Sequence, residues 1–300
     1  MSATASTPFD GIAIITGANS GLGFETARKI ASMSSEATVV LACRNPARGD
    51  EAQQAIFEST GNTHVKALQL DLSSLESARA FTANCVATLD KPIDSLVWNA
   101  GIAGAKGATV DGLDPVFETN HLGHFLLTLL LLPHLSPTAR ILSVSSDMHQ
   151  PPGPKLIWPG AEKLASTQQP ARVLRRRYSY SKLCNLYFTY ELTRRLGREH
   201  AGISAAAFNP GLITDTNFAT MPAFVGDVLK RVFASRVGDL DTSSTALAHL
   251  ATSIPGALLA GRYFDRTDAI SAPSSDLSYD QDNARELWQV SALLVGEKLD

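Results

Sequence analysis

The sequence predicts an α/β protein: one doubly wound domain with a mainly parallel, seven-stranded sheet and helices on both faces. Short runs rich in β-branched and apolar residues alternate with helix-length segments along all 300 residues. The runs are apolar throughout, which is typical of parallel strands covered on both faces. The alternation contains no internal repeat and no low-complexity linker, so residues 1–300 are expected to form one domain.

Seven runs have the length and composition of strands, from GIAIIT near the start of the chain to GRYFD near its end. Parallel strands joined through helices have right-handed crossovers, and this gives a Rossmann-type topology. The predicted strands are 11–16, 37–43, 64–72, 93–101, 139–146, 202–211 and 261–265.

Helix-length segments follow the strands. Ser73 and Ser74 are typical capping residues for the third helix, and a long helix passes through Tyr178. The Pro- and Gly-rich stretch 149–160 sits inside the alternation and is interpreted as a loop. The predicted helices are 22–33, 47–60, 74–89, 116–132, 178–197, 242–252 and 283–295.

Charge and hydrophobicity argue against two classes of protein. The net charge of −3 disfavours a nucleic-acid-binding protein, which would normally be basic. The most apolar run, 125–135, includes Pro133 and is shorter than the ~20 residues of a membrane-spanning helix. The N-terminal segment lacks the basic start and apolar stretch of a signal peptide. We therefore expect no nucleic-acid partner and no membrane span.

The cysteine and histidine positions predict no metal site. The three cysteines are widely spaced and form no CxxC pair, which favours a reducing, cytoplasmic environment. Three histidines near the middle of the chain also lack metal-ligand spacing, and core or loop histidines are far more common than ligands. The residues concerned are Cys43, Cys85, Cys184, His121, His124 and His149.

The stretch YSYSK, Tyr178 to Lys182, contains two tyrosines and a lysine. Residues four apart share one face of a helix, whereas residues two apart point to nearly opposite sides. Tyr178 can therefore lie beside Lys182, and Tyr180 is interpreted as a packed or exposed aromatic residue. An adjacent ammonium favours the phenolate and lowers a tyrosine pKa from about 10. The pair is thus a candidate proton donor near neutral pH.

The turn TGANSGLG joins the first strand to the first helix. Its spacing, Gly17-x-x-x-Gly21-x-Gly23, differs from the dinucleotide pattern GxGxxG. The glycines suit the same purpose, because they let the backbone turn sharply and approach a pyrophosphate at a helix N-terminus. Ser20 would add a hydroxyl contact. A glycine-rich turn without a ligand is the alternative.

Six short motifs follow one another along the chain. They are TGANSGLG (16–23), WNAG (98–101), NHLG (120–123), SVSS (143–146), YSYSK (178–182) and NPG (209–211). In this order they resemble the short-chain dehydrogenase/reductase family over nearly the whole chain. The stretches ACRN, NHLGHFLLT, SKLCNLYF and ARELWQVSALLVG resemble its retinol dehydrogenase and protochlorophyllide reductase branch.

The resemblance implies a nicotinamide cofactor. Arg44 follows the second strand, where proteins preferring NAD tend to carry an acid, and arginine suits a 2′-phosphate, so NADP (NADPH) is expected; a solvated loop arginine is the alternative. By resemblance, Asp71 touches the adenine edge and Pro210–Gly211 receives the nicotinamide carboxamide. The implied cofactor-binding residues are Gly17, Asn19, Ser20, Gly21, Leu22, Gly23, Arg44, Asp71, Leu72, Asn99, Ala100, Gly101, Tyr178, Lys182, Pro210, Gly211, Ile213 and Thr214.

The segment after Gly211 departs from the family pattern. The family often carries threonine five residues after the proline, and this chain has Asp215 there, between Thr214 and Thr216. Either threonine is a candidate for the cofactor contact. Substrate loops are expected at about 147–177 and 214–239, the second including a mobile lid.

By resemblance, the catalytic residues are Asn120, Ser146, Tyr178 and Lys182. Tyr178 would donate a proton to the carbonyl oxygen, and Lys182 would lower its pKa and hold the nicotinamide ribose. Ser146 would align the carbonyl oxygen, with family register alone favouring it over Ser145. Asn120 would hold a water for proton resupply, and helix capping is its alternative role.

These inferences predict an NADPH-dependent carbonyl reductase acting on an aldehyde or ketone, as a monomer or homodimer. A catalytically idle NADP-binding regulator and a C=C reductase of the protochlorophyllide type are the alternatives. Leu156, Ile157 and Trp158 are candidates for an apolar wall of the substrate cleft. The arginines of ARVLRRR would meet an acidic substrate or form a solvated helix start.

Overall fold

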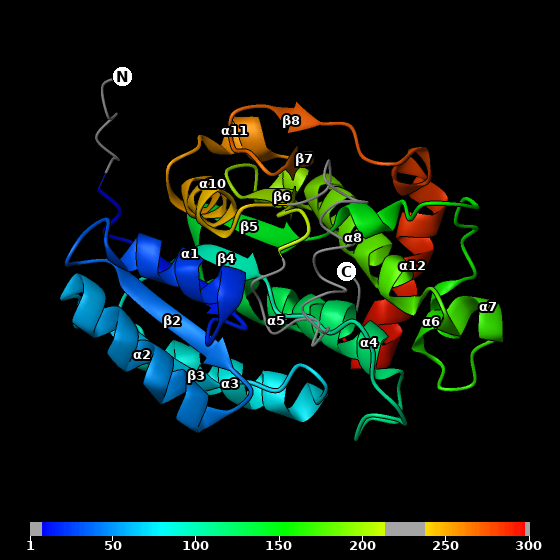
Figure 1. Cartoon of the computed structure of the whole chain (residues 1–300), viewed down its shortest axis with the longest axis horizontal. Helices are drawn as coiled ribbons and strands as arrows, with labels where there is room; N and C mark the ends of the chain where they lie inside the picture. Colours follow the sequence, from blue (N-terminus) through cyan, green and yellow to red (C-terminus); the bar gives the residue numbers. More distant parts are fainter. Residues whose placement is uncertain (1–7, 214–237, 298–300) are drawn as a thin grey trace, which may run out of the picture.

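An eight-stranded sheet forms the centre of the molecule (Figure 1), with strand order β3-β2-β1-β4-β5-β6-β7-β8. The computed structural model describes residues 8–213 and 238–297. Neighbouring strands are parallel except for β7 and β8. The strands are β1 (Ile12–Thr16), β2 (Thr38–Cys43), β3 (Val65–Gln69), β4 (Ile93–Trp98), β5 (Leu135–Val144), β6 (Ser204–Asn209), β7 (Arg262–Asp265) and β8 (Ser271–Ala272).

The structure confirms the predicted fold class and corrects the number of strands. All seven predicted strands are present, and β8 adds an eighth, which pairs antiparallel with β7. Two small residues, Ser271 and Ala272, carry no periodic hydrophobic signal, so nothing in the sequence distinguishes this strand from a loop.

Helices cover both faces of the sheet (Figure 1), with α1 packed on α10 and α8 packed on α12. Asn45 and Ser74 cap their helices through side-chain hydrogen bonds to backbone N–H groups. The α-helices are α1 (Gly21–Ala31), α2 (Pro46–Thr60), α3 (Leu75–Thr88), α4 (Pro115–Phe117), α5 (Gly123–Leu131), α6 (Ala161–Ala165), α7 (Ala171–Leu174), α8 (Arg177–Glu199), α10 (Leu240–Thr252), α11 (Gly256–Leu259) and α12 (Gln281–Val295). Short π- or 3₁₀-helical turns are η1 (Glu118–Leu122), η2 (Leu132–His134), η3 (Asp147–His149) and η5 (Asp276–Tyr279).

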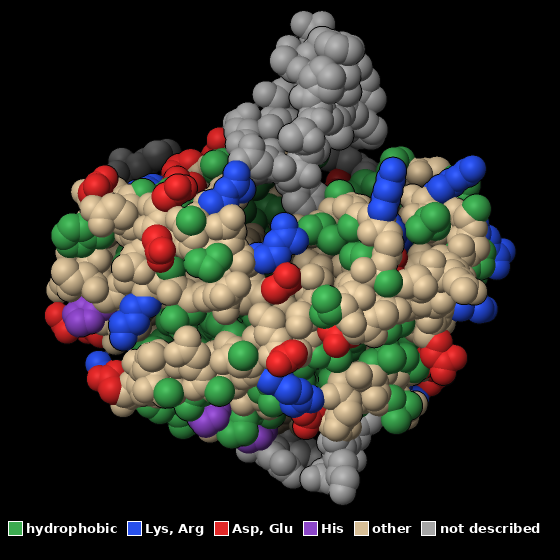
Figure 2. All heavy atoms as spheres, turned by 90° about the horizontal axis from the view of Figure 1, so that it is seen from below, with side chains coloured by type: hydrophobic (Ala, Val, Ile, Leu, Met, Phe, Trp, Pro, Cys, Tyr) green, Lys and Arg blue, Asp and Glu red, His purple; other side chains and the backbone are tan. Residues whose placement is uncertain are grey.

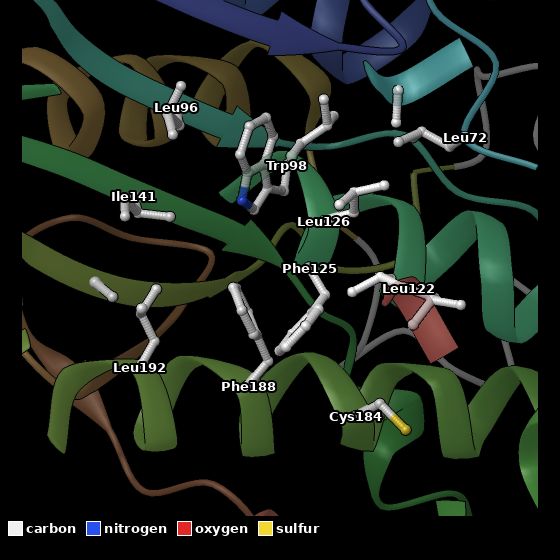
Figure 3. Packing of buried hydrophobic residues seen from close by; sticks show 14 of the residues in the cluster. Leu72, Leu96, Trp98, Leu122, Phe125, Leu126, Ile141, Cys184, Phe188 and Leu192 are labelled. Atoms are coloured by element: carbon white, nitrogen blue, oxygen red, sulfur yellow. The ribbon is translucent and has the colours of Figure 1, made fainter. Parts of the chain in front are cut away.

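An aromatic cluster fills the core between α5, α8 and α12. Phe125 of α5 and Phe188 of α8 face each other (Figure 3), with 6.1 Å between ring centroids. Trp288 of α12 lies 4.9 Å from Phe125 and 6.0 Å from Phe188. All three rings are buried, and such ring pairs add to the stabilisation from burial. The last helix therefore belongs to the core that holds α8 in place.

Some boundaries differ from the predicted ones in ways that matter for the site. Strand β5 ends at Val144, so the two serines that follow lie beyond the strand. The predicted helix 116–132 is interrupted by the π turn η1, on which Asn120 lies. The first substrate loop contains α6 and α7. Of the second, 214–239, positions 214–237 lie outside the described residues.

In the ranges that the structure describes, no helix has both the length and the apolar character needed to span a membrane. Within the same ranges, no three His, Cys, Asp or Glu side chains are grouped as metal ligands would be. On the face shown in Figure 2, Lys and Arg side chains are interspersed with Asp and Glu.

Candidate active site

A cavity of about 880 Å³ lies at the carboxyl ends of the parallel strands. In a doubly wound sheet, ligands bind at this edge, where the strand order reverses. Most of the residues predicted from the sequence line this cavity. They are Gly17, Asn19, Ser20, Gly21, Leu22, Arg44, Asp71, Leu72, Asn99, Ala100, Gly101, Ser146, Tyr178, Pro210, Gly211 and Ile213.

The turn after β1 requires glycine for two reasons. Gly17 and Gly21 have φ angles of 65° and 56°, in the left-handed region that favours glycine. At Gly23 the reason is space, because a Cβ atom would lie 2.4 Å from Asn99 Nδ2. The Asn99 amide donates to the carbonyls of Thr16 and Gly17 at 2.9 and 3.3 Å. Asn99 thus fixes the shape of the turn, and Gly23 packs behind it without lining the cavity.

The N-terminus of α1 opens toward the cavity. Ser20 occupies the N-cap position, but its side chain makes no capping hydrogen bond. The first backbone N–H groups of a helix have no partner within the helix, and the positive end of the helix dipole adds to their pull on an anion. Because 19–22 line the cavity, this end of α1 fits a pyrophosphate.

Two arginines from the junction of β2 and α2 line the cavity. Arg44 was predicted from the sequence, whereas Arg48 was missed. Asn45 caps α2 by accepting the Arg48 N–H at 3.2 Å, which places Arg48 in the first turn. Both arginines are exposed, and within the described residues neither guanidinium has a hydrogen-bond or ion-pair partner. The available signal was the spacing, since Arg48 follows Arg44 by four residues.

The segment 99–102 after β4 is held from two sides. The N–H groups of Asn99 and Ala100 both donate to Thr16 Oγ1 at 3.0 Å. At its other end, Asn120 Oδ1 accepts the Ile102 N–H at 2.7 Å, and Asn120 Nδ2 donates to the Ile102 carbonyl at 3.0 Å. Backbone that faces the cavity is therefore immobilised by one side chain from β1 and one from η1.

Asn120 is fully buried and does not line the cavity. Besides its two bonds to Ile102, its amide donates to Ser181 Oγ of α8 at 2.9 Å. The alternative role as a helix cap is wrong, because Asp114 caps this helical segment and Asn120 lies in its middle. A π turn at this point moves the side chain out of regular helical register, and such turns are frequent at functional sites.

The two serines after β5 have different surroundings. Ser145 is buried and donates to the Lys182 carbonyl at 2.9 Å, so it anchors α8. Ser146 lies at the start of η3, where its hydroxyl donates to Asp147 Oδ1 at 3.2 Å and accepts the Met148 N–H at 3.2 Å. Ser146 and Tyr178 both line the cavity. The Ser145 hydroxyl is thus occupied by the Lys182 carbonyl. This favours Ser146 as the serine for the carbonyl oxygen, a choice that family register alone had supported.

Tyr178 and Lys182 lie one turn apart on α8. The Lys182 ammonium is 5.7 Å from the centroid of the Tyr178 ring. Lys182 is buried, and its Nζ donates to the Val144 carbonyl at 2.9 Å rather than pointing into the cavity. Tyr180 is packed elsewhere, and its hydroxyl donates to the Ile157 carbonyl at 3.0 Å. The helical spacing correctly predicted that Tyr178, and not Tyr180, lies beside Lys182.

Burial decides the protonation of this pair. Loss of hydration raises the pKa of Tyr178 to about 12, although the neighbouring Ser146 hydroxyl opposes the rise. The same effect lowers the pKa of Lys182 to about 8. Burial therefore outweighs the lowering predicted for Lys182, and in the chain alone the pKa of Tyr178 is raised. Tyr178 stays protonated at neutral pH, which is the form that a proton donor needs.

Pro210 and Gly211 close the cavity after β6. Gly211 has a φ of 76°, and its N–H donates to Asn209 Oδ1 at 3.0 Å. Ser243 of α10 donates to the Pro210 carbonyl at 2.8 Å. Ile213 is the last described residue before the gap, so the predicted contact of Thr214, and its alternative Thr216, lie outside the described residues.

Several lining residues were missed from the sequence. Most of them directly follow a strand end or a recognised motif, so position relative to those motifs was the available signal. They are Ala42, Asn45, Arg48, Leu70, Ile102, Ala103, Thr119, Val144, Asp147, Met148, Pro152 and Leu212.

The expected apolar wall from 156–158 is wrong. Leu156 is buried in the core, and Ile157 is 79% exposed. Trp158 Nε1 donates to Glu286 Oε2 of α12 at 2.5 Å, and its ring packs edge-on against Tyr187 at 5.1 Å. This part of the loop packs on α8 and α12 and does not line the cavity.

The arginine run before Tyr178 does not line the cavity either. Arg177 pairs with Asp114 at 3.2 Å, and Arg176 donates to the Pro154 carbonyl at 2.7 Å. Arg172 and Arg175 are exposed. Of the two interpretations, the solvated helix start describes this run better than a contact with an acidic substrate.

A family model described as short chain dehydrogenase matches residues 11–169, more than half of the chain. This chain belongs to the short-chain dehydrogenase family. Retinol dehydrogenase 12 from Mus musculus is 35% identical over 289 residues, which cover 95% of this chain and 86% of that protein. The predicted branch of the family is thereby confirmed.

Two solved structures are similar to this chain. A crystal structure of an uncharacterized protein from Mycobacterium paratuberculosis is 31% identical, with a TM-score of 0.74 and 100% coverage of both chains. A short chain dehydrogenase from Shigella flexneri, complexed with NADP, is 20% identical with a TM-score of 0.64, covering 88% of this chain and 99% of that one. The second likeness shows a common fold.

Proposed function

We propose that this short-chain dehydrogenase is an NADPH-dependent carbonyl reductase that reduces an aldehyde or ketone, with Tyr178 as the proton donor. The observation that carries the proposal is that Ser146 and Tyr178 line one cavity together with the glycine turn and Arg44. A similar protein is named retinol dehydrogenase, and retinol is an alcohol, which supports an alcohol–carbonyl pair as substrate and product.

The cavity suits NADPH at several positions. The uncapped N-terminus of α1 would hold the pyrophosphate, and Arg44 and Arg48 would hold a 2′-phosphate. No acidic residue follows β2 directly, where a ribose 2′-hydroxyl would need one. The cofactor would supply the hydride, while the chain supplies orientation and charge. The preference for NADPH is also the basis for proposing reduction as the direction of the reaction.

The chain's own residues would then handle the carbonyl oxygen. Ser146 would donate a hydrogen bond to this oxygen and stabilise the charge that develops on it. Tyr178 would transfer its proton to the same oxygen. The buried Lys182 charge, 5.7 Å from the phenol ring, would stabilise the phenolate that forms. Asn120 does not reach the cavity. It would act by holding the 99–102 segment and Ser181 of α8 in place.

The test is NADPH consumption in the dark with a panel of aldehydes, ketones and diketones. Tyr178→Phe is expected to lower turnover about 100-fold or more while NADPH still binds. Tyr180→Phe is the matched control, because among the described residues its hydroxyl bonds to the Ile157 carbonyl alone, and it is expected to keep turnover. Full turnover in Tyr178→Phe would refute the assignment of the proton donor.

The two alternatives give different results in the same assay. An idle NADP-binding regulator would bind NADPH and reduce no carbonyl in the panel, and a C=C reductase would consume NADPH only with conjugated enones. The monomeric or homodimeric state and the cytoplasmic location stay predictions.

A further inference from the structure

His124, on α5, connects two parts of the site that are far apart in sequence. Its Nε2 lies 2.9 Å from Thr16 Oγ1 at the end of β1. Its Nδ1 lies 3.3 Å from the Asn120 backbone carbonyl in η1. The ring stacks on Trp98, with 5.3 Å between centroids and an angle of 24°. His124 is 3% exposed and does not line the cavity, so it touches neither cofactor nor substrate.

The hydrogen bonds around Thr16 assign the tautomer of this histidine. A hydroxyl oxygen has two lone pairs and one proton. Both lone pairs of Thr16 Oγ1 are used, because the N–H groups of Asn99 and Ala100 each donate to it at 3.0 Å. Its proton therefore points to His124 Nε2 at 2.9 Å, in preference to the Val97 carbonyl at 3.4 Å. His124 then carries its proton on Nδ1 and donates it to the Asn120 carbonyl.

These contacts place His124 between the two attachments of the 99–102 segment. Thr16 holds the start of this segment, and the Asn120 side chain holds its end at Ile102. His124 bonds to both holding residues, so it sets the position of η1 relative to β1. Gly101 lies within the held segment, where an added Cβ would be 3.2 Å from Asn120 Oδ1 and 3.6 Å from Lys182 Nζ.

We propose that His124 is a positioning residue that joins the Thr16 and Asn120 attachments and so keeps the 99–102 backbone in register with Lys182. This proposal rests on the proposed function for its prediction about NADPH, but not for its prediction about the backbone. Loss of His124 leaves the Thr16 proton and the Asn120 carbonyl to find other partners in a buried site. The segment then becomes mobile, and its cavity-facing backbone no longer presents one shape to the cofactor.

Two substitutions separate the two bonds of His124. In His124→Gln the amide lies where Nε2 was and accepts from Thr16, whereas in His124→Asn it lies where Nδ1 was and donates to Asn120. His124→Asn loses the bond to Thr16, which crosses to β1, and we expect it to weaken NADPH binding about tenfold. His124→Gln loses only the bond to Asn120 four residues earlier in the same helical segment, and we expect it to change NADPH binding less than about threefold. Cofactor fluorescence titration measures both. Equal loss in the two variants, or none in either, would overturn the proposal.

His121→Asn is the matched control. His121 is equally buried on the same helical segment, but its ring bonds to Ser291 of α12, away from the cavity. We expect it to lower the melting temperature without changing NADPH affinity. A loss of affinity like that of His124→Asn would show that any buried histidine here acts only through stability.

Amide hydrogen exchange tests the proposal in the protein alone. The Ala100 amide is expected to exchange about tenfold faster in His124→Asn than in the wild type or in His121→Asn. Unchanged exchange would overturn the inference even if NADPH bound as proposed. Faster exchange in a protein that binds no NADPH would instead refute the proposed function and leave His124 as a positioning residue.

Discussion

At the scale of the residue, Tyr178 and Lys182 show what sequence spacing can and cannot predict. A four-residue spacing predicts a shared helix face, and the two side chains do lie together on α8. It does not predict the sign of a pKa shift, because that depends on burial by residues distant in sequence. Desolvation outweighs the effect of the neighbouring charge. It raises the pKa of Tyr178 to about 12 and lowers that of Lys182 to about 8.

These two shifts predict the pH dependence of carbonyl reduction. The proposed mechanism needs a protonated Tyr178 and a charged Lys182. Tyr178 meets its condition up to about pH 12, whereas Lys182 loses its proton as the pH rises through about 8. We expect kcat/KM for reduction to be flat below this value and to fall above it, measured with one aldehyde across the range. The low activity of Lys182→Met is expected to lack that step, and a fall beginning only above pH 10 would contradict the assignment to Lys182.

At the scale of the element, the junction of β2 and α2 is the part of the chain that would carry the proposed preference for NADPH. The helix cap at Asn45 holds Arg48 in the first turn of α2, beside the cavity that Arg44 also lines. Two exposed guanidinium groups without partners in the described residues suit a phosphate that carries two charges.

We therefore expect removal of either arginine to change the selectivity between NADPH and NADH and to leave the rate of hydride transfer unchanged. Arg44→Ala and Arg48→Ala are each expected to raise KM for NADPH about tenfold while leaving KM for NADH nearly unchanged. Steady-state kinetics with both cofactors measure this, and Arg285→Ala, an exposed arginine on α12, serves as the control. An equal rise for NADPH and NADH would mean that the arginines do not contact a 2′-phosphate.

The loop 147–177 is the element for which sequence reasoning failed most. Its apolar residues were interpreted as a cleft wall, but Trp158 packs on Tyr187 and hydrogen-bonds to Glu286. Glu286 lies 128 residues further along the chain, and local composition carries no information about such a partner. By contrast, the glycine turn and the strand ends could be predicted, because their structure is determined by residues adjacent in sequence.

At the scale of the whole molecule, the last helix completes the core that positions the site. Trp288 packs against rings from α5 and α8, so residues from three distant parts of the chain meet. Strand–helix alternation was enough to predict the sheet and its topology, since these follow from general connection rules. The eighth strand and the cover of α8 by α12 depend on tertiary packing, which periodicity does not report.

The stability of the whole molecule should depend on pH through Glu118, a carboxyl group that is fully buried in η1. Within the described residues, neither of its carboxyl oxygens has a hydrogen-bond partner of acceptable geometry. Burial, reinforced by the nearby Asp111, raises its pKa from 4.5 to about 8. In the unfolded chain the group ionises near 4.5, so the unfolded state releases a proton that the folded state keeps. Stability from this group is therefore full at low pH and declines as the pH rises from about 4.5 to about 8.

Glu118→Gln removes this dependence while keeping the size of the side chain. The variant is expected to melt a few °C above the wild type at pH 8, and the gain should shrink toward zero at acidic pH, where the wild-type carboxyl is also neutral. Thermal unfolding across this range measures the difference, with the exposed Glu162→Gln as a control that should show no trend. If the gain were the same at every pH, Glu118 would be ionised in the folded protein. Its burial would then be compensated by partners other than the ones described.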